Sequence, residues 1–459
     1  MKTIKLFCMA ALTVMMAACS NTNNEIVPEQ PAAPEGIPFS ATVSSDETST
    51  TRALTLSGSV VEAAWAVDEE VAIIHDGIID KMSVVSVDGG TATISGTLTG
   101  TVADGDAVTV IYPYSAVDPA TGDVAADLLS SGVLDGSLSS ISTYCDVRKS
   151  TGVSLKISGG TATFSSAAVM KALFCILELT LKDLGDRDYK VNKLVICDES
   201  NNVLTTVNAS SATNVLYLSF NPGAASILKF FATKSGSYKG TAYTKVSATT
   251  LEPKFYQSTL KFARIDDYIL KSGAFADGHT TTTPANAVAR IAYIGREADT
   301  DHPDNYSGLA FARSNATVSG GIDHFAWCDQ GSDNCLTSGM DGIENTKALA
   351  AHATHNHVAA KAAAAFTVDG FTPSAYGFSD WFLASKDQVE RCALYSDTPI
   401  TNLKKYMGMS GSGFIYWTSS EADVANAYRW DEYPMLSPID KTKDYNSSNK
   451  MAVRPCIAF

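Results

Sequence analysis

The sequence has little positive charge and no long apolar run beyond its first residues. Its 459 residues include 34 Lys and Arg against 49 Asp and Glu, which gives a formal net charge of −15. This balance argues against nucleic acid and anionic lipid surfaces as partners. After residue 18 no apolar run approaches the roughly 20 residues that a membrane-spanning helix needs. The sequence therefore predicts no nucleic-acid partner and no transmembrane helix.

Familiar catalytic and metal-binding patterns are missing as well. In "AHATHNH", His352 and His355 are spaced to share one face of a predicted helix, and His357 is turned away. The HExxH zinc motif needs a Glu and a second His at i+4, and neither is present. We therefore interpret the segment as a solvated helix and predict no metal and no cofactor. No Ser/His/Asp order, phosphate loop or paired carboxylates are apparent, so we expect no enzymatic activity.

The cysteines show no CxxC pair and no metal-ligand spacing. Cys175 and Cys197 occur in apolar strand-like segments, which predicts packed thiols. An oxidising compartment would permit disulfides in the last third of the chain. The four cysteines there allow three connectivities, of which we predict the pairs Cys328–Cys335 and Cys392–Cys456.

The chain begins with the pattern of an export signal. Two lysines precede an apolar run of about eleven residues, and two alanines then precede Cys19. A cysteine in this place is typical of a lipobox, in which the thiol is acylated and becomes the mature N-terminus. The sequence thus predicts a signal peptide over residues 1–18 and a lipid anchor at Cys19. Residues 19–36 have almost no large apolar side chain, which predicts a flexible tether.

From residue 37 to about residue 262 the pattern predicts β-strands. The apolar stretches are short and alternate with polar residues, and Gly, Asn, Asp and Ser build the turns between them. Helix-period segments are scarce, which favours β-sandwiches. The segment "VRKSTG" interrupts the strands near residue 153. We therefore predict two sandwich domains, over residues 37–153 and 154–264.

Residues 265–459 differ in character and predict a separate α+β domain. The segment "NTKALAAHATHNHVAAKAAAAF" predicts one Ala-rich helix with Asn345 as its N-cap. The segment "SKDQVERCALY" predicts another helix, with Ser385 and Gln388 as a capping box. The last segment, "MAVRPCIAF", predicts an apolar strand that is folded into this domain.

The first two domains resemble the fimbrillin family, the subunits of type V pili of Bacteroidales and their surface-lipoprotein relatives. The resemblance depends on the order of the lipobox at Cys19, "IPFSATV", "TTRAL" with Arg52, "AAWAVDEEVAI" and "VMKALFCILELTL". The family has Gly-Asp where this chain has Asp68-Glu69. The resemblance implies two transthyretin-like sandwich domains and export as a lipoprotein to the outer membrane and cell surface.

The resemblance also implies a route of assembly by β-strand addition between pilin subunits. In fimbrillins a protease cuts after a basic residue behind the first strand, that strand leaves, and a strand of another subunit fills the groove. Arg52 is the candidate cleavage site here, although it could equally be an ordinary exposed arginine in a Ser/Thr-rich loop. Pairing of residues 37–43 on both sides, together with an inaccessible Arg52, would contradict this route.

The last third is similar to bacterial surface modules with a C-type-lectin-like fold, related in shape to the formylglycine-generating enzyme. The residues that match the family pattern lie in "GFSDWFLASKDQ", "YWTSSE", "NAYRW" and "VRPC". We expect Trp381 and Trp417 to pack in a loop-rich core. We expect Arg454 to form a buried ion pair with Glu421 or Asp380.

A recognition surface is predicted at "RWDEY". Trp430 beside Asp431 and Glu432 could stack on the face of a glycan, or could belong to a strand that ends in a solvated acidic turn. Sugar-binding Glu-Pro-Asn and Trp-Asn-Asp signatures are absent. The ligand would be a host or bacterial surface glycan or protein.

Taken together, the sequence predicts a mostly β, lipid-anchored cell-surface protein. It would be a fimbrillin-like pilus subunit, at the tip or in an accessory position, that acts as an adhesin. The alternative is a non-polymerising surface lipoprotein that binds glycans.

Overall fold

The computed structural model describes residues 36–459 except for sixteen short gaps and one longer one. The gaps are 46–54, 58–59, 63–64, 126–127, 129–133, 222–224, 235–240, 248–250, 252, 296–305, 318–320, 322, 330–334, 336–340, 395–413, 431–435 and 443–449. The predicted signal peptide, tether and lipidation site at Cys19 lie outside the described residues, as do Arg52, Asp431 and Glu432. Among the helices that are described, none combines the length and apolar content needed to cross a membrane.

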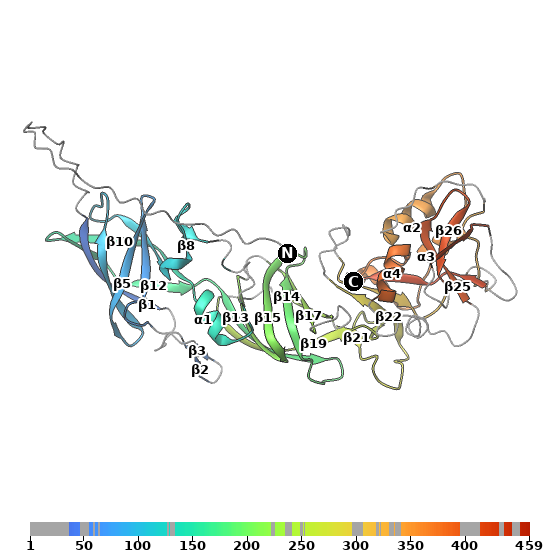
Figure 1. Ribbon diagram of the computed structural model, residues 1–459, viewed down its shortest axis with the longest axis horizontal. Coiled ribbons are helices and arrows are strands. Elements are labelled where there is room, and N and C mark those ends of the chain that lie inside the picture. The colour runs from blue at the N-terminus through green and yellow to red at the C-terminus, as the bar shows by residue number, and fades with distance from the viewer. Residues whose placement is uncertain are drawn as a thin grey trace, which may run out of the picture.

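The chain is mostly β, as predicted, and its sheets follow one another along the long axis of the molecule (Figure 1). The first unit is an eight-stranded sheet with the order β11-β1-β12-β10-β7-β4-β5-β6. Its strands are β1 (Ile37–Ser45), β4 (Glu70–His75), β5 (Ile78–Asp88), β6 (Thr91–Leu98), β7 (Ala107–Tyr112), β10 (Arg148–Ser158), β11 (Thr161–Phe164) and β12 (Ala168–Ala172). Two small hairpins accompany this sheet. The first pairs β2 (Thr55–Ser57) with β3 (Val60–Glu62). The second pairs β8 (Val117–Asp118) with β9 (Asp123–Val124) and follows a 3-10 turn at Tyr114–Ala116.

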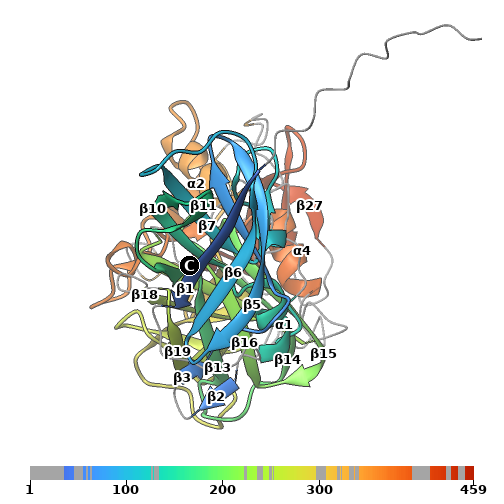
Figure 2. The same cartoon turned by 90° about the vertical axis from the view of Figure 1, so that its left-hand side faces the viewer.

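Strand β1 closes this sheet into a barrel. On one side it pairs antiparallel with β6, from Ile37 opposite Leu98 to Ser44 opposite Thr91. On its other side it pairs in parallel with β11 at Phe39 and with β12 at Val43 to Ser45. Figure 2 shows β1 running beside β6 and β5. The first strand is therefore bonded on both sides, which meets one of the two conditions that would contradict its loss. The other condition, an inaccessible Arg52, lies outside the described residues.

Alternation along β1 sorts its side chains between core and solvent. Phe39, Ala41 and Val43 are buried, and Ser40 and Thr42 between them are exposed. The ring of Phe39 meets that of Phe164 edge-on, with centroids 5.1 Å apart. This is the period-two alternation that the sequence predicts for a strand with one buried face.

The boundary predicted near residue 153 lies inside strand β10. Arg148, Lys149 and Ser150 pair with β7, and the register then shifts before Val153. Gly152 occupies this bulge with φ of 69°, a conformation that other residues rarely adopt. Because this bulge contains Ser and Gly, its sequence resembles that of a loop, and this is why a domain boundary was predicted here. The first sheet continues past the bulge to Ala172.

The second unit is a seven-stranded sheet with the order β15-β14-β17-β18-β19-β13-β16. Its strands are β13 (Cys175–Asp183), β14 (Val191–Cys197), β15 (Val203–Thr213), β16 (Val215–Phe220), β17 (Ile227–Thr233), β18 (Ala242–Ser247) and β19 (Phe255–Arg264). Only two residue pairs join β18 to β19. The sheet folds over there, and side chains from both halves share one core as in a sandwich. Helix α1 (Leu138–Tyr144) adds Ile141 to this core.

Within its described residues, the third unit combines a six-stranded and a four-stranded sheet with three helices. The larger sheet holds β20 (Tyr268–Leu270), β21 (Phe275–Ala276), β22 (Ala287–Ile294), β23 (Gly308–Ala312), β24 (Phe382–Leu383) and β29 (Pro455–Ala458). The smaller sheet holds β25 (Phe414–Glu421), β26 (Asn426–Trp430), β27 (Ser437–Asp440) and β28 (Lys450–Ala452). The helices are α2 (Gly342–Ala351), α3 (Val358–Ala364) and α4 (Lys386–Leu394), with a 3-10 turn at Pro373–Tyr376.

The C-terminal strand is folded into this unit, as predicted. Strand β29 pairs with β23 on one side and with β24 on the other. Residues 451–459 are all buried. The last strand therefore has no free edge to offer to another chain.

Prediction of a single Ala-rich helix was wrong. The segment forms α2 and α3, separated by residues 352–357. The N-cap of α2 is Asp341, whose carboxylate accepts hydrogen bonds from the backbone N–H groups of Ile343 and Glu344. The predicted cap, Asn345, is buried and donates to Ser419 Oγ at 3.3 Å.

A tertiary contact accounts for the break. The backbone N–H of Asn356 donates to Asp329 Oδ1 at 2.9 Å, and its carbonyl accepts from the N–H of Asp329 at 3.1 Å. A residue whose N–H and C=O are both bonded outside the helix cannot propagate it. By contrast, the capping box of α4 is confirmed: Ser385 N–H donates to Gln388 Oε1 at 2.9 Å, and Gln388 N–H donates to Ser385 Oγ at 3.2 Å.

Candidate functional site

A pocket with a volume of about 370 Å³ opens in the third unit, between helix α2 and the segment that leads into β24. This volume is at the lower end of the range of about 300–1,000 Å³ that is typical of small-molecule sites. The lining residues are Ile343, Thr346, Lys347, Ala364, Phe366, Thr367, Phe371, Thr372, Pro373, Asp380, Trp381 and Phe382.

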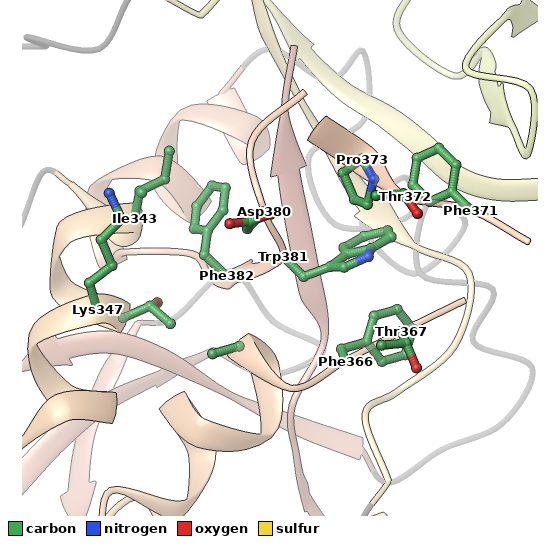
Figure 3. Close-up of a pocket in the computed structure, with 12 residues that line it drawn as sticks. Ile343, Lys347, Phe366, Thr367, Phe371, Thr372, Pro373, Asp380, Trp381 and Phe382 are labelled. Atoms are coloured by element: carbon green, nitrogen blue, oxygen red, sulfur yellow. The ribbon is translucent and has the colours of Figure 1, made fainter. Parts of the chain in front are cut away.

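Two walls of different character face each other across the pocket. Ile343 and Lys347 come from α2 and lie on one side, and Phe366, Phe371 and Trp381 lie on the other (Figure 3). Ile343 and Lys347 are four residues apart, so the helix places them on one face.

The aromatic wall is held by packing between rings. The rings of Phe366 and Trp381 meet edge-on with centroids 5.0 Å apart. Phe371 contacts Trp381 from another side, at 6.1 Å. Such edge-to-face contacts fix ring orientation and leave little freedom for the wall to collapse.

The polar groups of the pocket are few. Trp381 is 4% exposed, and its Nε1–H is buried with no hydrogen-bond partner among the described residues. Asp380, Thr367 and Thr372 are exposed at the rim. A buried donor without an acceptor is unfavourable by about 1–3 kcal/mol, so an acceptor on a ligand would relieve it.

The hydroxyl of Thr346 is already engaged. Leu383 N–H donates to Thr346 Oγ1 at 2.9 Å, and Thr346 Oγ1 lies 3.3 Å from the Leu383 carbonyl oxygen. Lys347 Nζ lies 2.7 Å from Glu344 Oε1 on the exposed face of α2. No cysteine, histidine or serine lines the pocket. The arrangement suits binding of a small, partly apolar molecule with an acceptor group.

The tryptophan of the predicted recognition surface is not available to a ligand. Trp430 is 5% exposed, and its ring stacks on Tyr416 with centroids 4.7 Å apart. The stacking platform predicted at Trp430 is therefore wrong, because this ring belongs to the core. Its predicted neighbours Asp431 and Glu432 lie outside the described residues.

The predicted disulfides are not formed. All seven cysteines that the structure describes are free thiols, including Cys328, Cys335, Cys392 and Cys456. Cys392 and Cys456 are fully buried in one apolar cluster. Burial raises the pKa of the Cys392 thiol to about 12, so it stays protonated and unreactive near neutral pH.

The predicted partners of Arg454 are wrong, and its buried position is confirmed. Its guanidinium donates to the Ala312 carbonyl at 2.9 Å and to Tyr416 Oη at 3.4 Å. Glu421 pairs instead with Lys441, which is fully buried. Trp417 is a core residue as expected and donates its Nε1–H to the Phe325 carbonyl at 2.8 Å.

Sequence analysis missed the pocket and the proximity of Cys335 to two histidines. The aromatic density of "FTPSAYGFSDWF" was the available signal for the pocket. The proximity of Cys335 to the histidines could not be predicted from a local sequence pattern, because Cys335 and His357 are 22 residues apart in the sequence. In the folded chain, Cys335 Sγ lies 3.1 Å from His357 Nε2.

No protein-family model matches the chain, and no curated protein matches it. Solved structures with similarity to it include a fimbrial protein from Bacteroides ovatus, with 11% identity and a TM-score of 0.27 over 93% of this chain and 100% of that chain. Another is a fimbrial assembly protein from Parabacteroides distasonis, with 10% identity and a TM-score of 0.27 over 49% of this chain and 89% of that chain.

Proposed function

We propose that this protein is a fimbrillin-like adhesin of the cell surface that joins a pilus by accepting a strand from another subunit. It would reach the outer membrane as a lipoprotein acylated at Cys19. Cleavage after Arg52 would then free the segment that carries β1. The order of sequence motifs that resembles fimbrillins is the observation that carries this proposal, and the geometry of β1 defines the groove that loss of this strand would open.

The position of β1 determines what a donor strand would find if the first strand were lost. Because β1 is hydrogen-bonded to β6 on one side and to β11 and β12 on the other, its loss would expose two facing rows of backbone groups. A donor strand in that groove could form both ladders, whereas an ordinary sheet edge offers only one. Loss of β1 would leave spaces where Phe39, Ala41 and Val43 had been. A donor strand with an apolar side chain at every second residue would fill these spaces, so they would favour that kind of strand.

Pairing on both sides also means that cleavage alone would not release the strand. Its buried side chains and its ladder would hold it until a competing strand displaced it, so exchange and release would be one step. Strand β29 is paired on both sides and ends in the core. A subunit that accepts a strand and donates none at this end would occupy a terminal or accessory position.

An Arg52→Gln variant tests the pilus assignment in the cells that make the protein. We expect wild-type chain to lose its first strand and to appear in sheared, high-mass surface polymers. The variant should keep its acylated N-terminus and remain in the membrane fraction. The measurement is immunoblotting of both fractions, with N-terminal sequencing of the mature chain.

Lys190→Gln is a matched control, since Lys190 is an exposed basic residue of the second unit. It should behave as wild type. If wild type and the Arg52→Gln variant showed the same distribution between the membrane fraction and the surface polymers, this result would contradict assembly through this cleavage. It would favour the non-polymerising lipoprotein, which stays on its acyl anchor and binds glycans.

The pocket of the third unit is the proposed adhesive site in either case. Its aromatic wall could pack on the apolar face of a sugar ring or of an amino-acid side chain, and the Trp381 N–H could donate to an acceptor on it. The ligand class is found by screening the full chain against surface glycans and matrix proteins.

For a ligand found in that screen, Trp381→Phe should weaken binding about two- to tenfold. The substitution keeps an aromatic wall and removes one donor, whose hydrogen bond contributes about 0.5–1.5 kcal/mol. Trp430→Phe changes a buried tryptophan outside the pocket and should leave affinity unchanged. Isothermal titration calorimetry measures both. If the two variants lost the same amount of binding affinity, or if neither lost any, this pocket would be excluded as the binding site.

A further inference from the structure

A thiol and two imidazoles converge in the third unit, and none of the three residues lines the pocket. They belong to Cys335, His352 and His357, and one ligand atom of each lies within 4.8 Å of those of the other two. Cys335 Sγ and His357 Nε2 are 3.1 Å apart. The ring centroids of His352 and His357 are 5.1 Å apart and the planes cross at 72°. In that arrangement the two rings can direct nitrogens toward one point.

The surrounding structure fixes each of these residues. His357 is fully buried at the start of α3, with its ring edge-on to Trp327 at 5.1 Å. His352 ends helix α2, and His355 stacks on its ring at 5.6 Å. The backbone N–H of Cys335 donates to Glu421 Oε2 at 2.9 Å.

The break between α2 and α3 creates the cluster. On one continuous helix His357 would be turned away from His352. The bonds between Asp329 and Asn356 turn the backbone at this point and bring both rings to the same side as Cys335.

We propose that Cys335, His352 and His357 bind a Zn²⁺ ion. One thiolate and two neutral imidazoles form a donor set that zinc favours, with Zn–S of about 2.3 Å and Zn–N of about 2.0–2.1 Å. Tetrahedral bonds of these lengths place neighbouring ligand atoms about 3.3–3.6 Å apart. To reach this geometry, the 3.1 Å between Cys335 Sγ and His357 Nε2 would lengthen slightly, and the wider separations, all within 4.8 Å, would shorten. Three protein ligands leave the fourth position to water.

Binding would release the thiol proton of Cys335, because the thiolate is the ligand. The carboxylate of Glu421 stands beside the Cys335 backbone and is itself paired with Lys441. The ion would link the segment at Cys335 to the turn between α2 and α3. A metal here would hold together two helices that also contribute residues to the pocket.

Metal binding by the full chain tests this proposal with Zn²⁺ alone as the probe. After removal of metal by a chelator, wild type should bind one equivalent of Zn²⁺ by competition with a chromophoric chelator. Cys335→Ser and His352→Gln should each lower the affinity by more than about 100-fold, since loss of an outer-shell partner alone lowers metal affinity about 10- to 100-fold. His324→Gln removes a histidine of the same unit outside the cluster and should bind as wild type.

A second measurement does not depend on the folding of any variant. Cys335 is partly exposed, whereas the other six described cysteines are buried. Iodoacetamide should therefore alkylate Cys335 in metal-free wild type, and one equivalent of Zn²⁺ should suppress that reaction, as located by peptide mass spectrometry. Absence of stoichiometric binding, unchanged affinity in Cys335→Ser, or alkylation of Cys335 unaffected by Zn²⁺ would each overturn the proposal.

Discussion

Phe39→Ala is expected to lower the free energy of unfolding of the first unit by about 3–5 kcal/mol, the usual effect of truncating a buried phenylalanine. Phe39 is 1% exposed and packs edge-on against Phe164. It lies on the strand that closes the barrel, between β6 and β11. Neighbouring strands held by ladders on both sides cannot move in to fill the cavity that alanine would leave.

The measurement has to be local, because three units contribute to any global signal. Hydrogen–deuterium exchange of β6 amides over a urea series reports on the partner of β1 directly. Thr42→Ala is the matched control: it lies on the same strand, is exposed, and should change stability by about 0.5 kcal/mol or less. A loss below about 1 kcal/mol for Phe39→Ala would mean that β1 contributes little to the closed barrel.

Asp267 is expected to make the junction between the second and third units less stable as the pH rises from about 4 to about 7. The residue is fully buried and accepts hydrogen bonds from the N–H groups of Arg264 and Gly278, at 2.7 and 2.8 Å. Burial raises the pKa of its carboxyl from 3.8 to about 7, despite those two donors. His279 Nε2 lies 3.7 Å away, and burial lowers the pKa of that imidazole.

The sign follows from the raised pKa. The folded chain keeps the proton on Asp267 up to about pH 7, and the unfolded chain loses it near pH 4. The contribution of Asp267 to the free energy of unfolding is therefore at its maximum below pH 4. This contribution is lost as the pH rises toward 7. At about 1.4 kcal/mol per pKa unit, the effect is at most about 4 kcal/mol.

Asp267→Asn separates this effect from general acid sensitivity. Relative to wild type, the free energy of unfolding of this variant should increase between pH 4 and pH 8, so that the variant becomes more stable by up to the amount above. Asp88→Asn, at an exposed aspartate, controls for the loss of one negative charge. Urea unfolding at several pH values, followed by exchange of the amides near Arg264 and Gly278, gives the comparison. A difference that does not vary with pH would show that Asp267 is already ionised in the folded chain.

Local sequence patterns were sufficient where a side chain's role is set by its own segment. The alternation in "IPFSATV" predicted the buried and exposed faces of β1, and Ser385 with Gln388 predicted the cap of α4. Burial of Trp417 was predicted as well.

Features that depend on distant residues could not be predicted in this way. Helix propensity favoured one helix through residues 352–357, and the hydrogen bonds between Asp329 and the backbone of Asn356 outweighed it. Trp430 alternates into the core because β26 pairs with β25, which places Tyr416 beneath its ring. Closure of the first sheet by β1 likewise depends on β6, more than forty residues away along the chain.

Replacement of β1 by an external strand is the most direct test of the central claim. The full chain is cut after Arg52 and mixed with a synthetic peptide of residues 37–45, and native mass spectrometry follows the mass of the complex. We predict one-for-one exchange of the cut segment for the peptide, and much weaker exchange for a peptide with the Phe39→Ala change. Retention of the cut segment at any excess of peptide would contradict strand exchange as the basis of assembly.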